Sequence, residues 1–167
     1  MSRNPVPLCK AIRKRDAMTD TTTPKALTGL PSYLLTRIAH RYNQTIHAEL
    51  KAIGLTTIST RIIASLKIFG ELTINELCVH ALAEQPTMSR ALDRLEGDRL
   101  ISRSVKDEDN RKRVVQLTAE GEALFERIWP VTLSANEAML QGITAEDREV
   151  TMRTLIKVLE NIRVHPF

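Results

Sequence analysis

The side chains with the clearest chemistry lie between Gln85 and Gly121. At the start of this segment, apolar residues recur at spacings of three, four and seven, which predicts a helix with one buried face. The other face carries two hydroxyls and two arginines: Thr87, Ser89, Arg90 and Arg94. Arginine can donate two hydrogen bonds to guanine, and hydroxyls near a helix N-terminus can bind phosphate. The pattern favours contact with nucleic acid, and its alternative is a solvated helix face on which Arg94 pairs with a nearby acid.

Two short β-type runs follow this helix, at residues 100–105 and 114–117, and a charged turn joins them. A helix followed by a two-stranded ribbon is the arrangement of a winged helix-turn-helix, in which the helix enters a major groove and the ribbon an adjacent minor groove. We expect Arg111, with Arg113 beside it, to insert at the wing tip, where arginine reads groove width, and Asp109 to orient Arg111. The alternative is a hairpin whose acids offset its cations.

Helical patterns on both sides position this segment. A capping box from Thr73 to Glu76 begins a short helix that precedes the arginine-bearing helix and completes a helix-turn-helix. The chain divides into a disordered basic leader at 1–29, a long helix at 30–54, a winged module at 55–120 and C-terminal helices at 121–167. We therefore expect a mainly α fold (α+β with a small β-wing). The long outer helices carry more apolar surface than the module can cover, so a homodimer is expected.

The net charge of +4 comes from one end of the chain. Residues 1–29 hold six basic and two acidic side chains, and the rest hold eighteen of each. The placement of individual arginines, and not the total charge, therefore has to support nucleic-acid binding. No apolar run of about 18 residues predicts a membrane helix. Cys9 and Cys78 form no disulfide framework, so we expect a cytoplasmic protein.

Four motifs occur in a fixed order: Gly54-Leu55-Thr56; Pro86-Thr87-Met88-Ser89-Arg90 with Asp93-Arg94-Leu95-Glu96; Asp109-x-Arg111; and Leu117-Thr118-x-x-Gly121. Through them, residues 30–162 resemble the MarR/SlyA family of bacterial transcriptional regulators. The chain departs from the common family pattern at Asn110, where an arginine is frequent, and at Cys78, where alanine is usual. The resemblance implies a homodimer that binds a pseudo-palindromic operator. It also implies small molecules, often aromatic or phenolic acids, that bind between the dimerisation helices and the winged module and release the DNA.

A few residues outside the winged module are candidates for other chemistry. His40, Arg41 and Tyr42 can line an effector cavity, because an acid ligand needs a cation or donor in a mostly apolar pocket. His40 and His47 share one side of a helix without a tight ligand cluster, so no metal or cofactor is expected. Cys78 is expected to be a buried structural thiol. The chain has no glycine-rich phosphate loop, nucleophile elbow or HExxH motif, which argues against an enzyme.

The leading hypothesis is a homodimeric, sequence-specific DNA-binding transcriptional regulator. It is expected to be a repressor that a small ligand, such as an aromatic acid, releases from double-stranded DNA. The alternative is a winged-helix protein-interaction module that does not read DNA. The polar outward face of the arginine-bearing helix argues against this alternative, because protein interfaces favour exposed aromatic or aliphatic anchors.

Overall fold

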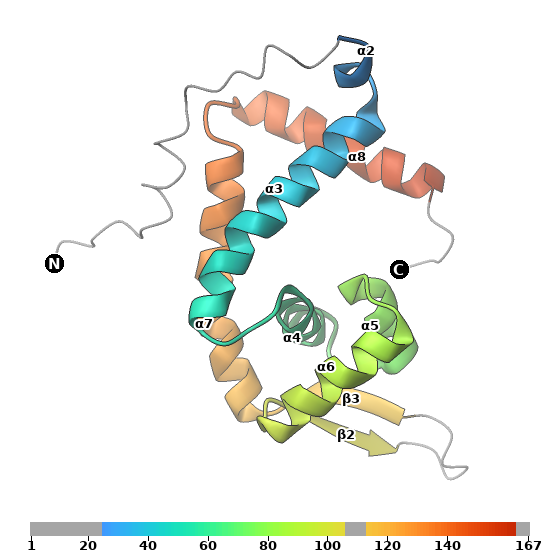
Figure 1. The fold of residues 1–167 in the computed structure, drawn as a ribbon, viewed down its shortest axis with the longest axis vertical. Helices are drawn as coiled ribbons and strands as arrows, with labels where there is room; N and C mark the ends of the chain where they lie inside the picture. Colours follow the sequence, from blue (N-terminus) through green and yellow to red (C-terminus); the bar gives the residue numbers. More distant parts are fainter. Residues whose placement is uncertain (1–24, 106–112, 163–167) are drawn as a thin grey trace, which may run out of the picture.

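The computed structural model describes residues 25–105 and 113–162. Its elements follow one another as α2 (Lys25–Thr28), α3 (Pro31–Ala52), α4 (Thr57–Phe69), β1 (Leu72–Thr73), α5 (Ile74–Ala81), α6 (Gln85–Gly97), β2 (Ile101–Val105), β3 (Arg113–Leu117), α7 (Ala119–Met139) and α8 (Ala145–Ile162). The predicted fold class, mainly α with a small sheet, is confirmed (Figure 1). The expected leader lies outside the described residues as far as position 24, and its end forms the short helix α2 instead.

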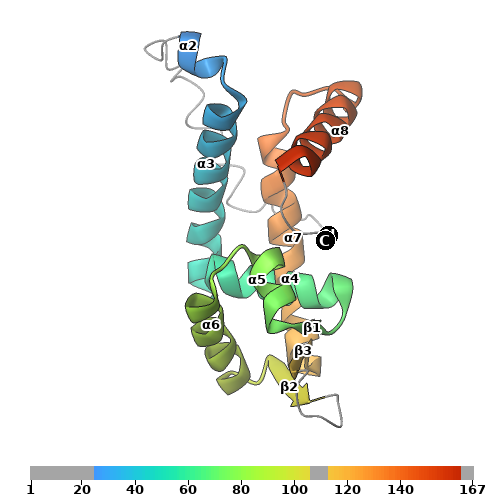
Figure 2. The ribbon, with the colours of Figure 1, turned by 90° about the vertical axis from the view of Figure 1, so that its right-hand side faces the viewer.

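The long helices α3 and α7 lie side by side as an arm, and α4, α5, α6 and the sheet form a module at its end (Figures 1 and 2). Helix α8 turns away from the far end of α7 and stands apart from α3 in Figure 2. Arg148 fixes the corner between α7 and α8. Its guanidinium donates to the Leu140 carbonyl at 2.9 Å and pairs with the Glu137 carboxylate at 2.9 Å. The direction of α8 is therefore set by contacts within the chain.

Helix α4 forms the centre of the module's core. Ile62, Ile63 and Leu66 are buried against Leu77 of α5 and Leu92 of α6. Full burial of such a side chain contributes about 1.5–3 kcal/mol, so the three helices are held together as one unit. A smaller cluster joins α3 to α7 and consists of Ile46, Leu50 and Ala135.

Membrane-spanning potential is low in the described chain, where no single helix is long and apolar enough to cross a bilayer. Only α3 and α4 taken together have the length and apolar composition of a membrane span, and the chain bends by 88° between them.

The sheet has three antiparallel strands in the order β1-β3-β2. The register of β2 on β3 runs from Ile101 opposite Leu117 to Val105 opposite Arg113. Both strands match the predicted β-type runs to within one residue. Strand β1 is too short for its sequence to show alternation, and its pairing with β3 becomes visible only in the fold.

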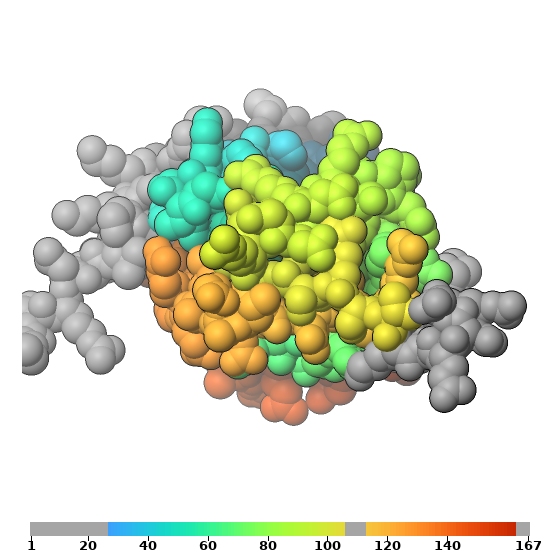
Figure 3. Space-filling view, turned by 90° about the horizontal axis from the view of Figure 1, so that it is seen from below, coloured from blue at the N-terminus to red at the C-terminus, as the bar shows by residue number. Residues whose placement is uncertain are grey.

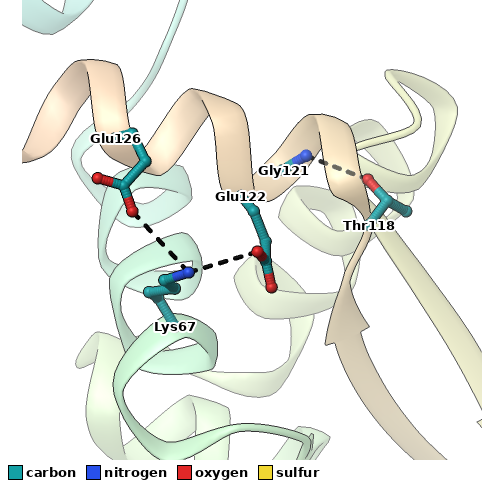
Figure 4. Close-up of polar contacts among 5 residues, drawn as sticks. All are labelled: Lys67, Thr118, Gly121, Glu122 and Glu126. Carbon is teal, nitrogen blue, oxygen red and sulfur yellow. Dashed lines mark hydrogen bonds and ion pairs between the residues drawn. The ribbon is translucent and has the colours of Figure 1, made fainter.

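Threonine hydroxyls cap the N-termini of four helices in the described chain. Each accepts a hydrogen bond from a backbone amide three residues further on, and the capping residues are Thr56, Thr73, Thr118 and Thr144. Such a cap contributes about 1 kcal/mol, and the cap at Thr73 belongs to the predicted capping box. Close to Thr118, Lys67 of α4 lies 3.4 Å from Glu122 and 3.9 Å from Glu126 of α7 (Figure 4). These contacts hold the start of α7 against the module.

Candidate nucleic-acid interface

Helices α5 and α6 form the predicted helix-turn-helix. The chain turns sharply between them because Leu82 adopts a left-handed conformation, with φ 54°. Helix α6 buries Met88, Leu92 and Leu95 in the core. Its opposite side lies at the surface of the module, with the wing strands beside it, on the side away from the arm (Figures 1 and 3). One face of α6 therefore anchors the helix, and the other is open to a partner.

The predicted contact residues of α6 occupy this open face. Thr87, Ser89 and Arg90 are all exposed in the first two turns of the helix. Arg90 makes no hydrogen bond or ion pair with any described residue. Its five guanidinium N–H donors are therefore available to an acceptor outside the described chain.

Arg94 has different surroundings, although it is also exposed. Its Nη2 donates to the Gly54 carbonyl oxygen at 3.1 Å, and its Nε lies 3.8 Å from the Asp98 carboxylate. Gly54 belongs to the turn between α3 and α4 and has a φ of 75°. The contact with Asp98 is one of the pairings that the sequence offers as an alternative to DNA contact. Arg94 therefore links α6 to the end of the arm.

Arg103 of β2 is a charged residue of this surface that sequence reasoning missed. Its Nη2 lies 2.7 Å from Asp93 Oδ1 and its Nε lies 3.3 Å from Glu96 Oε2, and both acids belong to α6. Two acids on the polar face of a helix that is expected to contact nucleic acid need a counter-charge, and that need is the available sequence signal. The partner lies ten residues away in a strand whose register is not readable from the sequence.

The described part of the wing includes one of its three predicted contact residues. Arg113 is exposed at the start of β3, opposite Val105. Asp109 and Arg111, which the sequence assigns to the tip, lie outside residues 25–105 and 113–162.

A cavity of about 320 Å³ lies between α3 and α7. Its lining combines two guanidinium groups with a phenol ring and apolar side chains, and includes Arg37, Arg41, Tyr42, Ala135 and Met139. Two of the three predicted effector contacts, Arg41 and Tyr42, are therefore at this cavity. His40 is not in the lining, and its ring nitrogen lies 3.0 Å from the Gln44 amide nitrogen.

A smaller cavity of about 100 Å³ lies between the arm and α4. Tyr42 lines both cavities, and Arg61 lines the smaller one. The Tyr42 hydroxyl accepts a hydrogen bond from Asn136 of α7 at 3.3 Å. Two adjacent cavities therefore lie along the arm, and each has at least one arginine in its lining.

Other candidate chemistry finds no further support. Cys78 is half-buried beside the core, and burial raises the pKa of its thiol, which disfavours the reactive thiolate. In the part of the chain that the structure describes, no three His, Cys, Asp or Glu side chains are arranged to hold a metal ion.

A helix-turn-helix with an exposed arginine face, followed by an antiparallel wing, defines a winged helix-turn-helix protein. A model described as MarR family matches residues 53–113. The HTH-type transcriptional repressor IacR of Pseudomonas putida is 30% identical over 132 residues, which cover 79% of each chain. The chain belongs to the MarR family of transcriptional regulators, as the sequence motifs predict.

Solved structures have the same architecture. A MarR family regulator from Silicibacter pomeroyi is 42% identical with a TM-score of 0.78, and the match covers 84% of this chain and 95% of that one. Staphylococcus aureus MepR, in a DNA-binding conformation, is 25% identical with a TM-score of 0.72, and the match covers 80% and 99%. The relatives are transcriptional regulators and not enzymes, which agrees with the prediction from the sequence.

Proposed function

We propose that this chain is a homodimeric repressor that binds a pseudo-palindromic operator in double-stranded DNA. The observation that carries the proposal is the open face of α6, where Arg90 is exposed without a partner among the described residues. Arg90 donates two hydrogen bonds to a guanine in the major groove, which discriminates against other bases by about 1–3 kcal/mol. Thr87 and Ser89 bind phosphates near the N-terminus of α6, where the helix dipole favours negative charge.

The wing supplies a second contact in this proposal. Arg111 enters the adjacent minor groove, Arg113 stands beside it at the start of β3, and Asp109 orients Arg111. Arg94 is the weakest candidate for base contact, since its guanidinium already donates to the Gly54 carbonyl.

A second copy of the chain covers the apolar surface at the end of the arm. Helix α8 has no buried residue in the described chain. Exposed apolar side chains occur on three helices of this region and include Leu34, Ile38, Leu133, Met139, Leu155, Ile156, Leu159 and Ile162. Two-fold pairing is the commonest way to bury such a surface. It sets two α6 helices about 10 bp apart, in successive major grooves.

A small aromatic acid is the proposed effector. The larger arm cavity has the mixture that such a ligand needs, with Arg37 and Arg41 for the carboxylate and Ala135 and Met139 for the ring. Its volume of about 320 Å³ is at the lower end for small-molecule sites. A repressor role is supported by the relationship to IacR, which is named a repressor. The proposed location is the cytoplasm, where the operator is accessible.

The test is binding of a fluorescent duplex from the region upstream of the chain's own gene, with random DNA as competitor. Arg90→Ala removes the bidentate donor, so the preference for operator over random DNA should fall by roughly 10- to 100-fold. Because Arg90 is exposed, the melting temperature and the oligomeric state should not change.

Arg153→Ala is the matched control, because it removes an exposed arginine from the polar face of α8, where Arg153 pairs with Glu149. Operator binding by this variant should match the unaltered protein. Unchanged specificity in Arg90→Ala would rule out the proposed reading by α6. If random competitor DNA displaces the operator duplex from the unaltered protein, the result would favour the protein-interaction module instead.

A further inference from the structure

The polar face of α6 carries acids as well as the arginine that reads DNA. Asp93 follows Arg90 by three residues and therefore lies on the same side of the helix, one turn further on. The side chains of Asp93 and Glu96 are 64% and 43% exposed. Carboxylates at this surface face a phosphate backbone when α6 enters a groove, and like charges repel. The chain therefore has to neutralise or displace them.

Arg103 reaches both carboxylates from the neighbouring strand. Its Nη2 lies 2.7 Å from Asp93 and its Nε lies 3.3 Å from Glu96, so one guanidinium spans two acids that are three residues apart. The Arg103 side chain is only 26% exposed. Its Nε is buried and has no regular hydrogen bond within the described chain, so Glu96 compensates it mainly through charge. The planar fork of arginine suits such a contact better than the point charge of lysine.

The position of Arg103 in the sheet makes this contact a link between two DNA-binding parts. Arg103 stands opposite Val115 in the central strand β3, and Val115 is fully buried in the core. The backbone of Arg103 is therefore fixed by the sheet, while its side chain holds α6. Ion pairs at this degree of exposure contribute little to stability. Their main effects here concern charge and orientation at the interface.

We propose that Arg103 is a positioning residue for DNA binding. It does not touch the operator. It neutralises Asp93 and Glu96 and fixes the recognition helix against the wing, so that Arg90 and the wing arginines engage one stretch of DNA together. This inference rests on the proposed binding of DNA through α6. The segment from Pro86 to Arg113 has eight cations and six acids, so internal pairing decides which charges the DNA meets.

Arg103→Gln tests the inference with the full-length protein and the same upstream duplex. Two uncompensated carboxylates should weaken operator binding about tenfold or more, since each close like-charge contact near the surface costs on the order of one tenfold step. The melting temperature should fall by no more than about 4 °C. Arg99→Gln is the control. It removes a cation from the turn before β2 but leaves the contacts of Asp93 and Glu96 with Arg103 in place.

The decisive variant removes the acids together with their partner. Adding Asp93→Asn and Glu96→Gln to Arg103→Gln should restore operator affinity to within about threefold of the unaltered protein, since no unpaired carboxylate remains. If Arg103 contacted DNA directly, or only stabilised the fold, operator affinity should not recover in this triple variant. Failure to recover would overturn the inference, and so would unchanged affinity in Arg103→Gln alone.

A measurement without DNA separates this inference from the proposed function. Introduced alone, Asp93→Asn should lower the melting temperature. Introduced into the Arg103→Gln variant, it should leave the melting temperature unchanged. Additive effects of the two substitutions would show that the pair is not coupled and would overturn the inference. Absence of operator binding by the unaltered protein would instead count against the proposed function.

Discussion

Two arginines on the polar face of α6 have different surroundings. Arg90 is exposed without a partner among the described residues, whereas Arg94 donates to the Gly54 carbonyl and lies near Asp98. An arginine whose donors are already occupied must lose those contacts before it binds a base, which reduces its net contribution. We therefore propose that base reading by α6 is concentrated in the first two turns of the helix and that Arg94 acts through the position of α6.

The surroundings of Gly121 explain why the motif Leu117-Thr118-x-x-Gly121 has glycine at its last position. A Cβ atom at this position would collide with the Leu100 carbonyl oxygen and lie 3.1 Å from the Leu117 Cδ2 atom. A backbone oxygen cannot move aside as a flexible side chain can, because Thr118 N donates to it at 3.2 Å. Gly121→Ala should therefore lower the free energy of unfolding by about 1–3 kcal/mol, although alanine is the better helix former. Urea denaturation gives this value directly.

Gly97→Ala is the matched control for Gly121→Ala. Gly97 is the last residue of α6, and a Cβ atom there would have no heavy atom within 4 Å. Its stability should stay the same or rise by about 0.4–1 kcal/mol, because alanine restricts the unfolded chain. Equal stability of the two variants would contradict the close-approach explanation.

At the scale of single residues, the sequence predicts which side chains are buried better than it predicts their hydrogen-bond partners in distant parts of the chain. The buried face of α6 follows from the spacing of Met88, Leu92 and Leu95, since a helix repeats every 3.6 residues. The capping box at Thr73 is local, and its four-residue motif predicts it correctly. The bond from Arg94 to Gly54 joins residues 40 positions apart, and no local pattern indicates it.

At the scale of elements, α3 and α7 form both the arm and its larger cavity. Arg37, Arg41 and Tyr42 belong to α3, and Ala135 and Met139 belong to α7. A ligand between two helices contacts both, so its binding favours one spacing of the arm. Because α3 ends at the turn that Arg94 contacts, we propose that a change in the arm reaches α6 through the Gly54 carbonyl.

Arg41→Ala tests the assignment of this cavity to an aromatic carboxylate. Benzoate at 100 times its Kd should stabilise the unaltered protein by about 2.7 kcal/mol, which raises the melting temperature by roughly 5–10 °C. Removing Arg41 deletes a hydrogen bond to a charged group and should weaken benzoate binding roughly 10- to 100-fold. Thermal shift as a function of benzoate concentration measures both values.

Two controls make this test specific. Lys51→Ala removes an exposed cation from the same helix without touching either cavity lining, and its benzoate response should be unchanged. Benzamide has the ring without the charge and should produce a much smaller shift. Equal shifts from benzoate and benzamide would show that the arginines do not select the ligand.

The elements themselves were largely predictable because most of them are long and amphipathic. The pattern from residue 30 to 54 predicts α3 to within two residues at either end, and the two wing strands also follow from their composition. The cavity is not predictable in this way. Arg41 and Tyr42 indicate only that one helix carries a cation and a phenol, and Ala135 and Met139 are brought to them by packing of α3 on α7.

At the scale of the whole molecule, the arm carries apolar side chains that the single chain leaves exposed. The buried contacts between α3 and α7 are at Ile46, Leu50 and Ala135, while α8 has no buried residue and most of its side chains are exposed. Arg148 holds α8 at a fixed direction away from α7, so the exposed surface has a defined shape. A preformed apolar surface loses little entropy on pairing, which favours a stable dimer.

Leu155→Glu tests whether the dimer and operator binding depend on each other. Leu155 is 37% exposed in the single chain and lies on the apolar side of α8, so its replacement should leave the fold intact. Each dimer contains two copies, and an unpaired carboxylate in the apolar interface at each should raise the dimer Kd by about 100-fold or more. Sedimentation velocity should then detect a monomer with a preserved melting curve.

The same variant should bind the operator weakly, because a monomer presents one α6 to one half-site. Asn161→Glu adds the same charge about 120° around α8 from Leu155, outside its apolar side, and should remain dimeric with full operator affinity. If Leu155→Glu stays dimeric, α8 is not part of the interface. If it becomes monomeric and retains full affinity, one winged module is sufficient for the operator. We expect both properties to be lost together, because a near-neutral α6 and wing should need two half-sites for strong binding.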